Sequence, residues 1–160
     1  MTGVHGVIIR EATPADVHIL AQLNREVQQI HVEAHPHVFK QLTNDLSVVE
    51  AWILDREGTF FISELDGLPM GYAYVEVIDR PENPFTFAWR FMVIDQIAVS
   101  PLYQGRGVGR ELVARCVAFA SASGAKQVLL NTWDFNHQAQ AFFRRCGFET
   151  VRYQMQLMIE

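Results

Sequence analysis

A glycine-rich turn stands between a strand-like run and a helical pattern. Ile97-Ala98-Val99 leads into Ser100-Pro-Leu-Tyr-Gln104-Gly105-Arg106-Gly107-Val108-Gly109, and Arg110 follows. The first N–H groups of a helix have no partner inside the helix, and the helix dipole places partial positive charge there. Glycine lets an oxygen approach the backbone closely, and an arginine side chain adds charge. The turn therefore predicts a site for a phosphate or pyrophosphate.

Two widespread phosphate motifs do not fit this spacing. The dinucleotide fingerprint G-x-G-x-x-G fails because its third glycine would fall on Arg110, counted from Gly105, or on Leu112, counted from Gly107. The P-loop fails because no lysine follows any pair of glycines at the required distance. A glycine-rich turn before a helix can also be purely structural, so the turn alone does not decide the function.

A second motif lies one predicted strand downstream of the turn. The first, Gln104-x-x-Gly107-x-Gly109 after an Ile-x-Val strand, resembles the acetyl-CoA pyrophosphate motif of the GNAT superfamily of N-acetyltransferases. The second, Asn136-x-x-Ala139-x-x-Phe142-Phe143-x-x-x-Gly147-Phe148, resembles the superfamily's Asn-x-x-Ala-x-x-Leu/Phe-Tyr-x-x-x-Gly-Phe stretch. The order of elements over the whole chain is also similar, including Ile9-Arg10-x-Ala12-x-x-x-Asp16 at its start.

The resemblance implies an acetyl-CoA-dependent N-acetyltransferase that moves an acetyl group directly to a primary amine, with acetyl-CoA as co-substrate and no metal. In the superfamily the loop amides hold the pyrophosphate, the preceding strand binds the pantetheine arm, and the downstream helix packs along the cofactor. Asn131 falls in mid-strand among apolar residues, where a buried amide must find partners, so it serves either pantetheine or the fold. The residues expected to bind acetyl-CoA are Ile97, Ala98, Val99, Gln104, Gly105, Arg106, Gly107, Val108, Gly109, Arg110, Asn131, Asn136 and Phe143.

Phe143 departs from the family pattern. The superfamily usually has tyrosine there, whose hydroxyl is thought to protonate the departing thiolate, and phenylalanine cannot do so. The pKa of a thiol is near 8.5, so a thiolate is a tolerable leaving group near neutral pH, and water or Tyr103 could supply the proton. Catalysis is the favoured interpretation. The alternative is a non-catalytic acyl-CoA-binding sensor or interaction module on the same fold, and a dinucleotide oxidoreductase is a distant third.

Direct transfer needs a neutral amine, which favours a positioned base. Asp95 is the candidate general base, because it lies in the long strand and shares side-chain parity with Ile97 and Val99 if no bulge intervenes. Its alternative role is an ion pair with Arg90. Glu76 and Asp134 are weaker candidates for the base or for binding a cationic acceptor, and either could be an ordinary surface carboxylate.

Histidines and cysteines are the other groups that could carry chemistry. His31, His35 and His37 with Glu33 could contact the acceptor or lie on the surface, and zinc is disfavoured because Pro36 opposes helical geometry at His35. Cys116 and Cys146 fall on apolar stripes and are predicted to be core thiols. The reaction needs no covalent intermediate, so a missing nucleophile is no objection.

Apolar periodicity gives the remaining elements. Strands are predicted at 7–10, 59–65, 70–77, 87–99, 127–133 and 148–159, with helices from Thr13-Pro14 to about His31, after Asn44-Asp45, and at 107–122 and 136–146. This β-α-α-β-β-β-α-β-α-β order predicts an α/β fold with a GNAT-like mixed, mostly antiparallel sheet and about four helices packed on its faces.

Length and composition fit one N-acetyltransferase domain over residues 1–160. The chain is 49% hydrophobic with a net charge of −5, which disfavours nucleic acid and leaves a cationic amine acceptor open. No apolar run is long enough to span a bilayer, the start lacks the order of a secretory signal, and two cysteines make no disulfide framework. A cytoplasmic protein without a membrane partner is expected, and a homodimer is expected by analogy with relatives.

Overall fold

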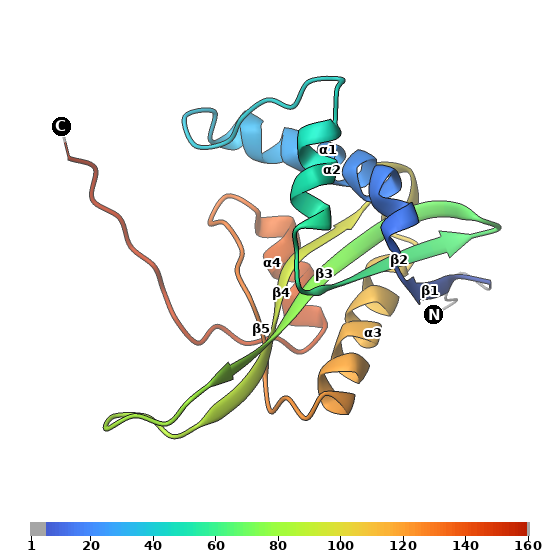
Figure 1. Cartoon of the computed structure of the whole chain (residues 1–160). Coiled ribbons are helices and arrows are strands. Elements are labelled where there is room, and N and C mark those ends of the chain that lie inside the picture. Colours follow the sequence, from blue (N-terminus) through green and yellow to red (C-terminus); the bar gives the residue numbers. More distant parts are fainter. Residues whose placement is uncertain (1–5, 160) are drawn as a thin grey trace.

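The computed structural model describes residues 6–159. Its centre is a sheet of five strands that neighbour one another in chain order (Figure 1). They are β1 (Ile8–Glu11), β2 (Thr59–Leu65), β3 (Leu68–Arg80), β4 (Trp89–Val99) and β5 (Val128–Leu130). The first four pair antiparallel, whereas β5 runs parallel to β4. The predicted mixed, mostly antiparallel sheet is therefore confirmed.

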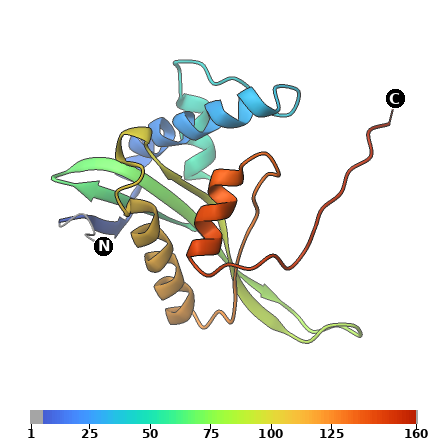
Figure 2. The same ribbon diagram turned by 180° about the vertical axis from the view of Figure 1, so that it is seen from behind.

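Helices cover both faces of this sheet (Figures 1 and 2). They are α1 (Val17–Ala34), α2 (Ser47–Leu54), α3 (Val108–Ala122) and α4 (His137–Arg145), with short 3-10 turns at Pro14–Asp16 and Pro101–Tyr103. On one face Leu112 and Cys116 of α3 pack in a core with Phe61 of β2. On the other, α1 and α2 pack against the neighbouring strand residues Phe60 and Ile62. Successive residues of β2 thus serve opposite layers, as the period of a strand requires.

An ionic network fixes the start of α1 against the sheet. The Arg10 guanidinium donates to both carboxylate oxygens of Asp16, at 2.9 and 2.7 Å, and to Glu64 at 3.2 and 2.7 Å. Asp16 also accepts from the Thr13 backbone N–H at 2.8 Å, which closes the predicted helix start. The hydrogen bonds from Arg10 hold the pKa of Asp16 well below its usual range. The start of α1 is therefore anchored to β1 and β2.

A bulge interrupts the pairing of β3 with β4. Tyr74 lies opposite Gln96 and Val75 lies opposite Ile94, so Asp95 is the extra residue on β4. The parity argument for Asp95 required a strand without a bulge, and that condition is not met. The bulge shifts the alternation of β4 by one residue between its first half and Ile97–Val99.

The last two predicted strands differ from the observed structure. The strand predicted at 127–133 pairs only over Val128–Leu130, and the strand predicted at 148–159 is wrong, because residues 149–159 form no strand. They run outward from the end of α4 instead (Figures 1 and 2). The alternating sequence fits a strand, but no strand within residues 6–159 pairs with this segment. Among the helices of this same range, none combines the length and the apolar character that crossing a membrane would take.

Candidate functional site

The glycine-rich turn forms the start of α3. Gly105 and Gly107 have φ of 74° and 88°, in the left-handed region that favours glycine. Gly107 is the N-cap of α3, so no side chain covers the first amides of the helix. A Cβ added at Gly105 or Gly107 would meet no protein atom within 4 Å. The turn therefore leaves open backbone at the positive end of a helix of 15 residues, and the geometry fits a pyrophosphate.

Side chains at the turn support this shape. Gln104 Nε2 donates to the Val99 carbonyl at 3.0 Å, which holds the end of β4 against the turn. The Arg106 guanidinium lies 5.8 Å from the centre of the Tyr103 ring. Gly109, in the first turn of α3, contacts α4, because a Cβ there would stand 3.1 Å from the Phe142 ring. The two sequence motifs are thus packed together in space.

A gap opens between β4 and β5 beside this turn. The parallel pairing ends at Ile94 with Leu130, so within residues 6–159 no strand faces the last part of β4 on that side. The Ser100 amide donates to Met70 on β3 at 2.8 Å. Because backbone groups alternate in direction along a strand, Ala98 faces β3, whereas the amides of Ile97 and Val99 face the gap. These are the main-chain groups expected to bind pantetheine and the thioester carbonyl.

Acidic side chains lie on the adjacent part of β3 and β4. Asp95 is exposed at the bulge, and Glu76 is half-buried on β3. Partial desolvation, with a smaller contribution from the negative charge of Glu76, raises the pKa of Asp95. The Tyr74 hydroxyl donates to Glu76 at 2.5 Å, and burial raises the pKa of Tyr74 to about 12. Arg90 pairs with Asp79 at 2.6 Å, which removes the alternative partner that the sequence offered for Asp95.

A buried polar network lies behind these acids. The Tyr72 hydroxyl donates to Gln96 Oε1 at 2.8 Å, and Asn24 Nδ2 of α1 donates to the same oxygen at 3.1 Å. Asn24 also reaches the Tyr72 hydroxyl at 3.0 Å. The sequence analysis missed these residues. The spacing of two tyrosines on β3 could have indicated this network, because Tyr72 and Tyr74 are two residues apart and therefore share a face of the sheet.

Aromatic side chains join the loop after α1 to the loop after β5. His35 packs against Trp133 and Phe135, with ring centres 5.0 and 5.2 Å apart. His31 packs against Phe39 at 4.9 Å, and its Nδ1 lies 3.0 Å from the Val27 carbonyl. The predicted histidine cluster is thus part of an aromatic contact, and in the described range 6–159 no group of three or more metal-binding side chains comes together.

The remaining predicted residues have clear local roles. Asn136 caps α4, because its side-chain oxygen accepts from the Ala139 amide at 3.0 Å. Asn131 lies beyond the end of β5 and is exposed, so the prediction of a buried mid-strand amide is wrong. Phe143 is 7% exposed and packs edge-on against Phe142 and Phe148. Burial raises the pKa of both cysteine thiols. Cys116 is fully buried, as predicted for a core thiol, whereas Cys146 is only half-buried and lies outside the core.

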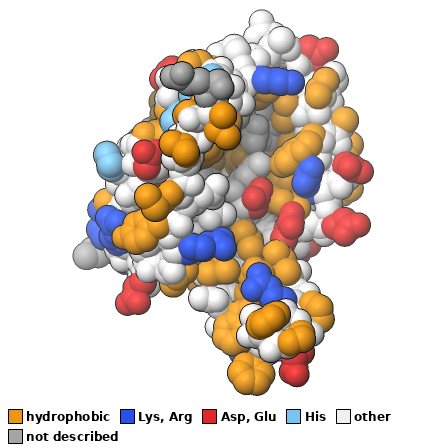
Figure 3. Space-filling view, turned by 90° about the vertical axis from the view of Figure 1, so that its left-hand side faces the viewer, with side chains coloured by type: hydrophobic (Ala, Val, Ile, Leu, Met, Phe, Trp, Pro, Cys, Tyr) orange, Lys and Arg blue, Asp and Glu red, His pale blue; other side chains and the backbone are white. Residues whose placement is uncertain are grey.

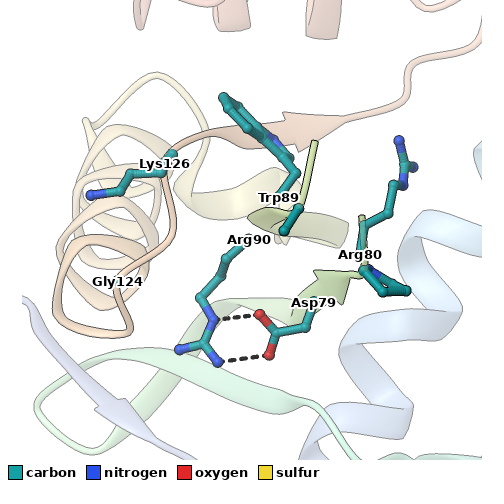
Figure 4. A pocket seen from close by; sticks show the side chains of 8 residues that line it. Asp79, Arg80, Trp89, Arg90, Gly124 and Lys126 are labelled. Atoms are coloured by element: carbon teal, nitrogen blue, oxygen red, sulfur yellow. Dashed lines mark hydrogen bonds and ion pairs between the residues drawn. The ribbon is translucent and has the colours of Figure 1, made fainter. Parts of the chain in front are cut away.

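A separate pocket of about 580 Å³ lies at the other end of β4 (Figure 4). Arg80, Trp89 and Lys126 line it, beside the Asp79–Arg90 ion pair. Since β4 has 11 residues, its two ends are about 33 Å apart. This pocket is therefore not part of the site at the glycine-rich turn.

Comparison with known proteins decides the family. A family model described as the acetyltransferase (GNAT) family matches residues 24–148. The chain belongs to the GNAT family. This GNAT chain is 29% identical to the aminoglycoside N(6')-acetyltransferase type 1 of Stenotrophomonas maltophilia, with 88% of this chain and 85% of that protein covered. It is 32% identical to the mycothiol acetyltransferase of Saccharomonospora viridis over 67% of this chain, but it spans only 34% of that longer protein.

Solved structures share the GNAT fold. A tetramutant of the BH1408 protein from Bacillus halodurans superposes with a TM-score of 0.86 at 23% identity, covering 95% of this chain and 99% of that one. An aminoglycoside N-acetyltransferase AAC(6')-Iy in complex with CoA superposes with a TM-score of 0.72 at 18% identity, covering 96% and 94%. The predicted GNAT-like sheet with helices on both faces is confirmed.

Proposed function

We propose that this chain transfers an acetyl group from acetyl-CoA directly to a primary amine of a small molecule or peptide. The observation that carries the proposal is the open helix start at Gly107, next to a strand whose Ile97 and Val99 amides face the side where pairing with β5 has ended. Membership of the GNAT family supports it, as do relatives named as N-acetyltransferases. Transfer also needs a base that accepts the proton of the amine and a way for the CoA thiolate to leave.

The chemistry follows from the positions of these groups. Backbone amides of the turn would hold the pyrophosphate, and Arg106 and Arg110 would add positive charge. The carbonyl oxygen of the thioester gains negative charge when the amine attacks, and a main-chain N–H at Ile97 or Val99 would stabilise it. Asp95 would accept the proton that the amine loses. The carbon–sulfur bond then breaks, and the electron pair leaves with the CoA thiolate.

A non-catalytic acyl-CoA binder is the second candidate, and Phe143 is the observation that favours it. This residue stands where the family usually has the tyrosine thought to protonate the thiolate. Release of CoA thiol that depends on an added amine separates the two functions. An N-acetyltransferase releases thiol with at least one member of a panel of polyamines, aminoglycosides, amino acids and peptides, whereas a binder releases none.

Restoring a hydroxyl at position 143 should have a modest effect. Thiolate is a good leaving group, so the wild-type protein should be active. Its pH–rate profile should show no fall in rate at high pH of the kind that ionisation of a tyrosine acid would cause. Phe143→Tyr should raise turnover severalfold with little change in acetyl-CoA affinity, measured by steady-state kinetics and calorimetry. The neighbouring change Phe142→Tyr is the matched control, because it adds the same hydroxyl to the adjacent phenylalanine of the same helix. If only Phe143→Tyr shows turnover and wild type shows none, the natural chain is an acyl-CoA binder.

The acceptor should be cationic. Glu76 and Asp95 stand together near the gap, and the chain carries a net charge of −5. Attraction between exposed charges is screened over about 10 Å at 0.1 M salt. For the best amine in the panel, kcat/KM should therefore fall as sodium chloride is raised, while acetyl-CoA consumption without acceptor stays flat. A best substrate that is neutral or anionic would contradict this prediction.

A further inference from the structure

Two arginines from different helices lie at the contact between α3 and α4. Arg110 is in the first turn of α3, next to Gly109, where an added Cβ would stand 3.1 Å from the Phe142 ring. Arg145 is the last residue of α4, and it shares a helical face with Phe142 because the two are three positions apart. Both arginines are therefore close to one packed contact, beside the open helix start at Gly107.

The Cys146 thiol shows that the two guanidinium groups reach the same place. Burial raises the pKa of this thiol, and the positive charges of Arg110 and Arg145 act against that rise. The Cys146 amide donates to the Phe142 carbonyl at 3.1 Å, which fixes this residue at the end of α4. Two charges that act on one fixed thiol belong to side chains that converge near it.

Neither arginine has an acidic partner in the described part of the chain. The ion pairs within residues 6–159 are made by Arg10 and Arg90. Arg110 and Arg145 are exposed, so their guanidinium groups are free to meet a ligand. Figure 3 shows the lysine and arginine side chains of one face scattered among acidic and apolar ones, without a broad basic area. In a chain with a net charge of −5, an anion between α3 and α4 must therefore be held by a local pair of charges.

We propose that Arg110 and Arg145 bind the 3′-phosphate of acetyl-CoA, and that Arg145 thereby determines which acetyl donors the chain accepts. This rests on the proposed function, because it takes the diphosphate of the donor to lie at the Gly107 helix start. The ribose next to the diphosphate carries the 3′-phosphate, which therefore comes close to the start of α3. Such a phosphate monoester has a charge of about −1.5 to −2 at pH 7, and the forked guanidinium group suits its oxygens. A donor without this phosphate would leave both arginines unpaired.

Removal of the phosphate and removal of Arg145 should have the same effect on affinity. Titration calorimetry compares acetyl-CoA with acetyl-dephospho-CoA, which lacks only the 3′-phosphate. Wild type should bind acetyl-CoA about tenfold more tightly, because hydrogen bonds between charged groups are strong. Arg145→Gln should bind the two donors with affinities within about twofold of each other, since the phosphate has then lost its partner.

Arg144→Gln is the matched control for this comparison. It removes the same charge from the same helix, but consecutive side chains of a helix point about 100° apart, so it should keep the preference for acetyl-CoA. Equal affinities of wild type for the two donors, or an equal loss of preference in the two variants, would overturn this proposal and leave the acetyltransferase proposal standing. Failure of both donors to bind wild type would overturn both proposals.

Alkylation of Cys146 tests the position of the phosphate independently. The thiolate is the reactive form, and a phosphate bound to the two arginines cancels the charges that favour it. With each donor at saturation, acetyl-CoA should slow the reaction of Cys146 with iodoacetamide more than acetyl-dephospho-CoA does, measured by mass spectrometry of the Cys146 peptide. Cys116 is fully buried and serves as the internal reference. Equal rates with the two donors would place the phosphate away from these arginines and overturn the proposal.

Discussion

Gly107→Val should weaken the binding of acetyl-CoA at least tenfold, which corresponds to about 1.4 kcal/mol. The new side chain has room in the protein alone, since no atom lies within 4 Å of its Cβ. It would instead fill the space through which a pyrophosphate approaches the first amides of α3. Titration calorimetry with acetyl-CoA measures the effect directly, on protein whose circular dichroism matches wild type.

Backbone strain needs its own control, because valine at the φ of 88° found at Gly107 is unfavourable by about 1–2 kcal/mol. Gly124→Val provides it. Gly124 follows the other end of α3 and has a φ of 75°, and its Cβ would only touch Arg90 at 4.0 Å. It should lower stability similarly and leave acetyl-CoA affinity unchanged. Equal affinities in the two variants would remove the turn at Gln104–Gly109 from the binding site.

Asp95→Asn should lower turnover by about 10²–10⁴-fold and remove the limb of the pH–rate profile at low pH. A base must be deprotonated, so the rate of wild type should rise with pH through the raised pKa of Asp95. Glu76→Gln supplies a second readout. It removes a charge that raises the pKa of Asp95, so it should retain kcat at saturating acceptor and move the limb to lower pH. An unaltered profile in Asp95→Asn would mean that the amine loses its proton elsewhere.

Loss of stability should not explain the loss of activity in Asp95→Asn. A carboxyl whose pKa is raised in the folded state binds its proton more tightly there than in the unfolded chain. Its ionisation therefore costs stability as pH rises through the folded pKa. At neutral pH the asparagine variant should melt at the wild-type temperature or above it, which a thermal unfolding scan checks.

Local signals predicted most of the fold and the turn. The helix start at Thr13-Pro14 follows from capping chemistry, and the open start of α3 follows from glycines whose positive φ the structure confirms. The roles assigned to those residues with acetyl-CoA, and the single-domain assignment over residues 1–160, stay predictions.

Long-range pairing decided what the sequence could not predict. The bulge at Asp95 depends on the register of β3 against β4, and no residue of β4 marks it. Asn131 is exposed because β5 ends at Leu130, where the partner strand diverges. The last predicted strand is absent because an alternating pattern shows that a segment has an apolar face, but it does not show which strand the segment pairs with. The aromatic contact of His35 with Trp133 joins residues nearly a hundred positions apart and leaves no local pattern.

Transfer of a labelled acetyl group is the measurement that tests the central proposal most directly. Wild-type protein is incubated with acetyl-CoA labelled in the acetyl group and with the best amine of the panel, and product and free thiol are measured in the same samples. The proposal predicts labelled N-acetylated amine and CoA thiol in equal amounts, with no label retained on the protein. Acetyl-CoA that binds but yields neither product nor thiol with any amine would contradict it.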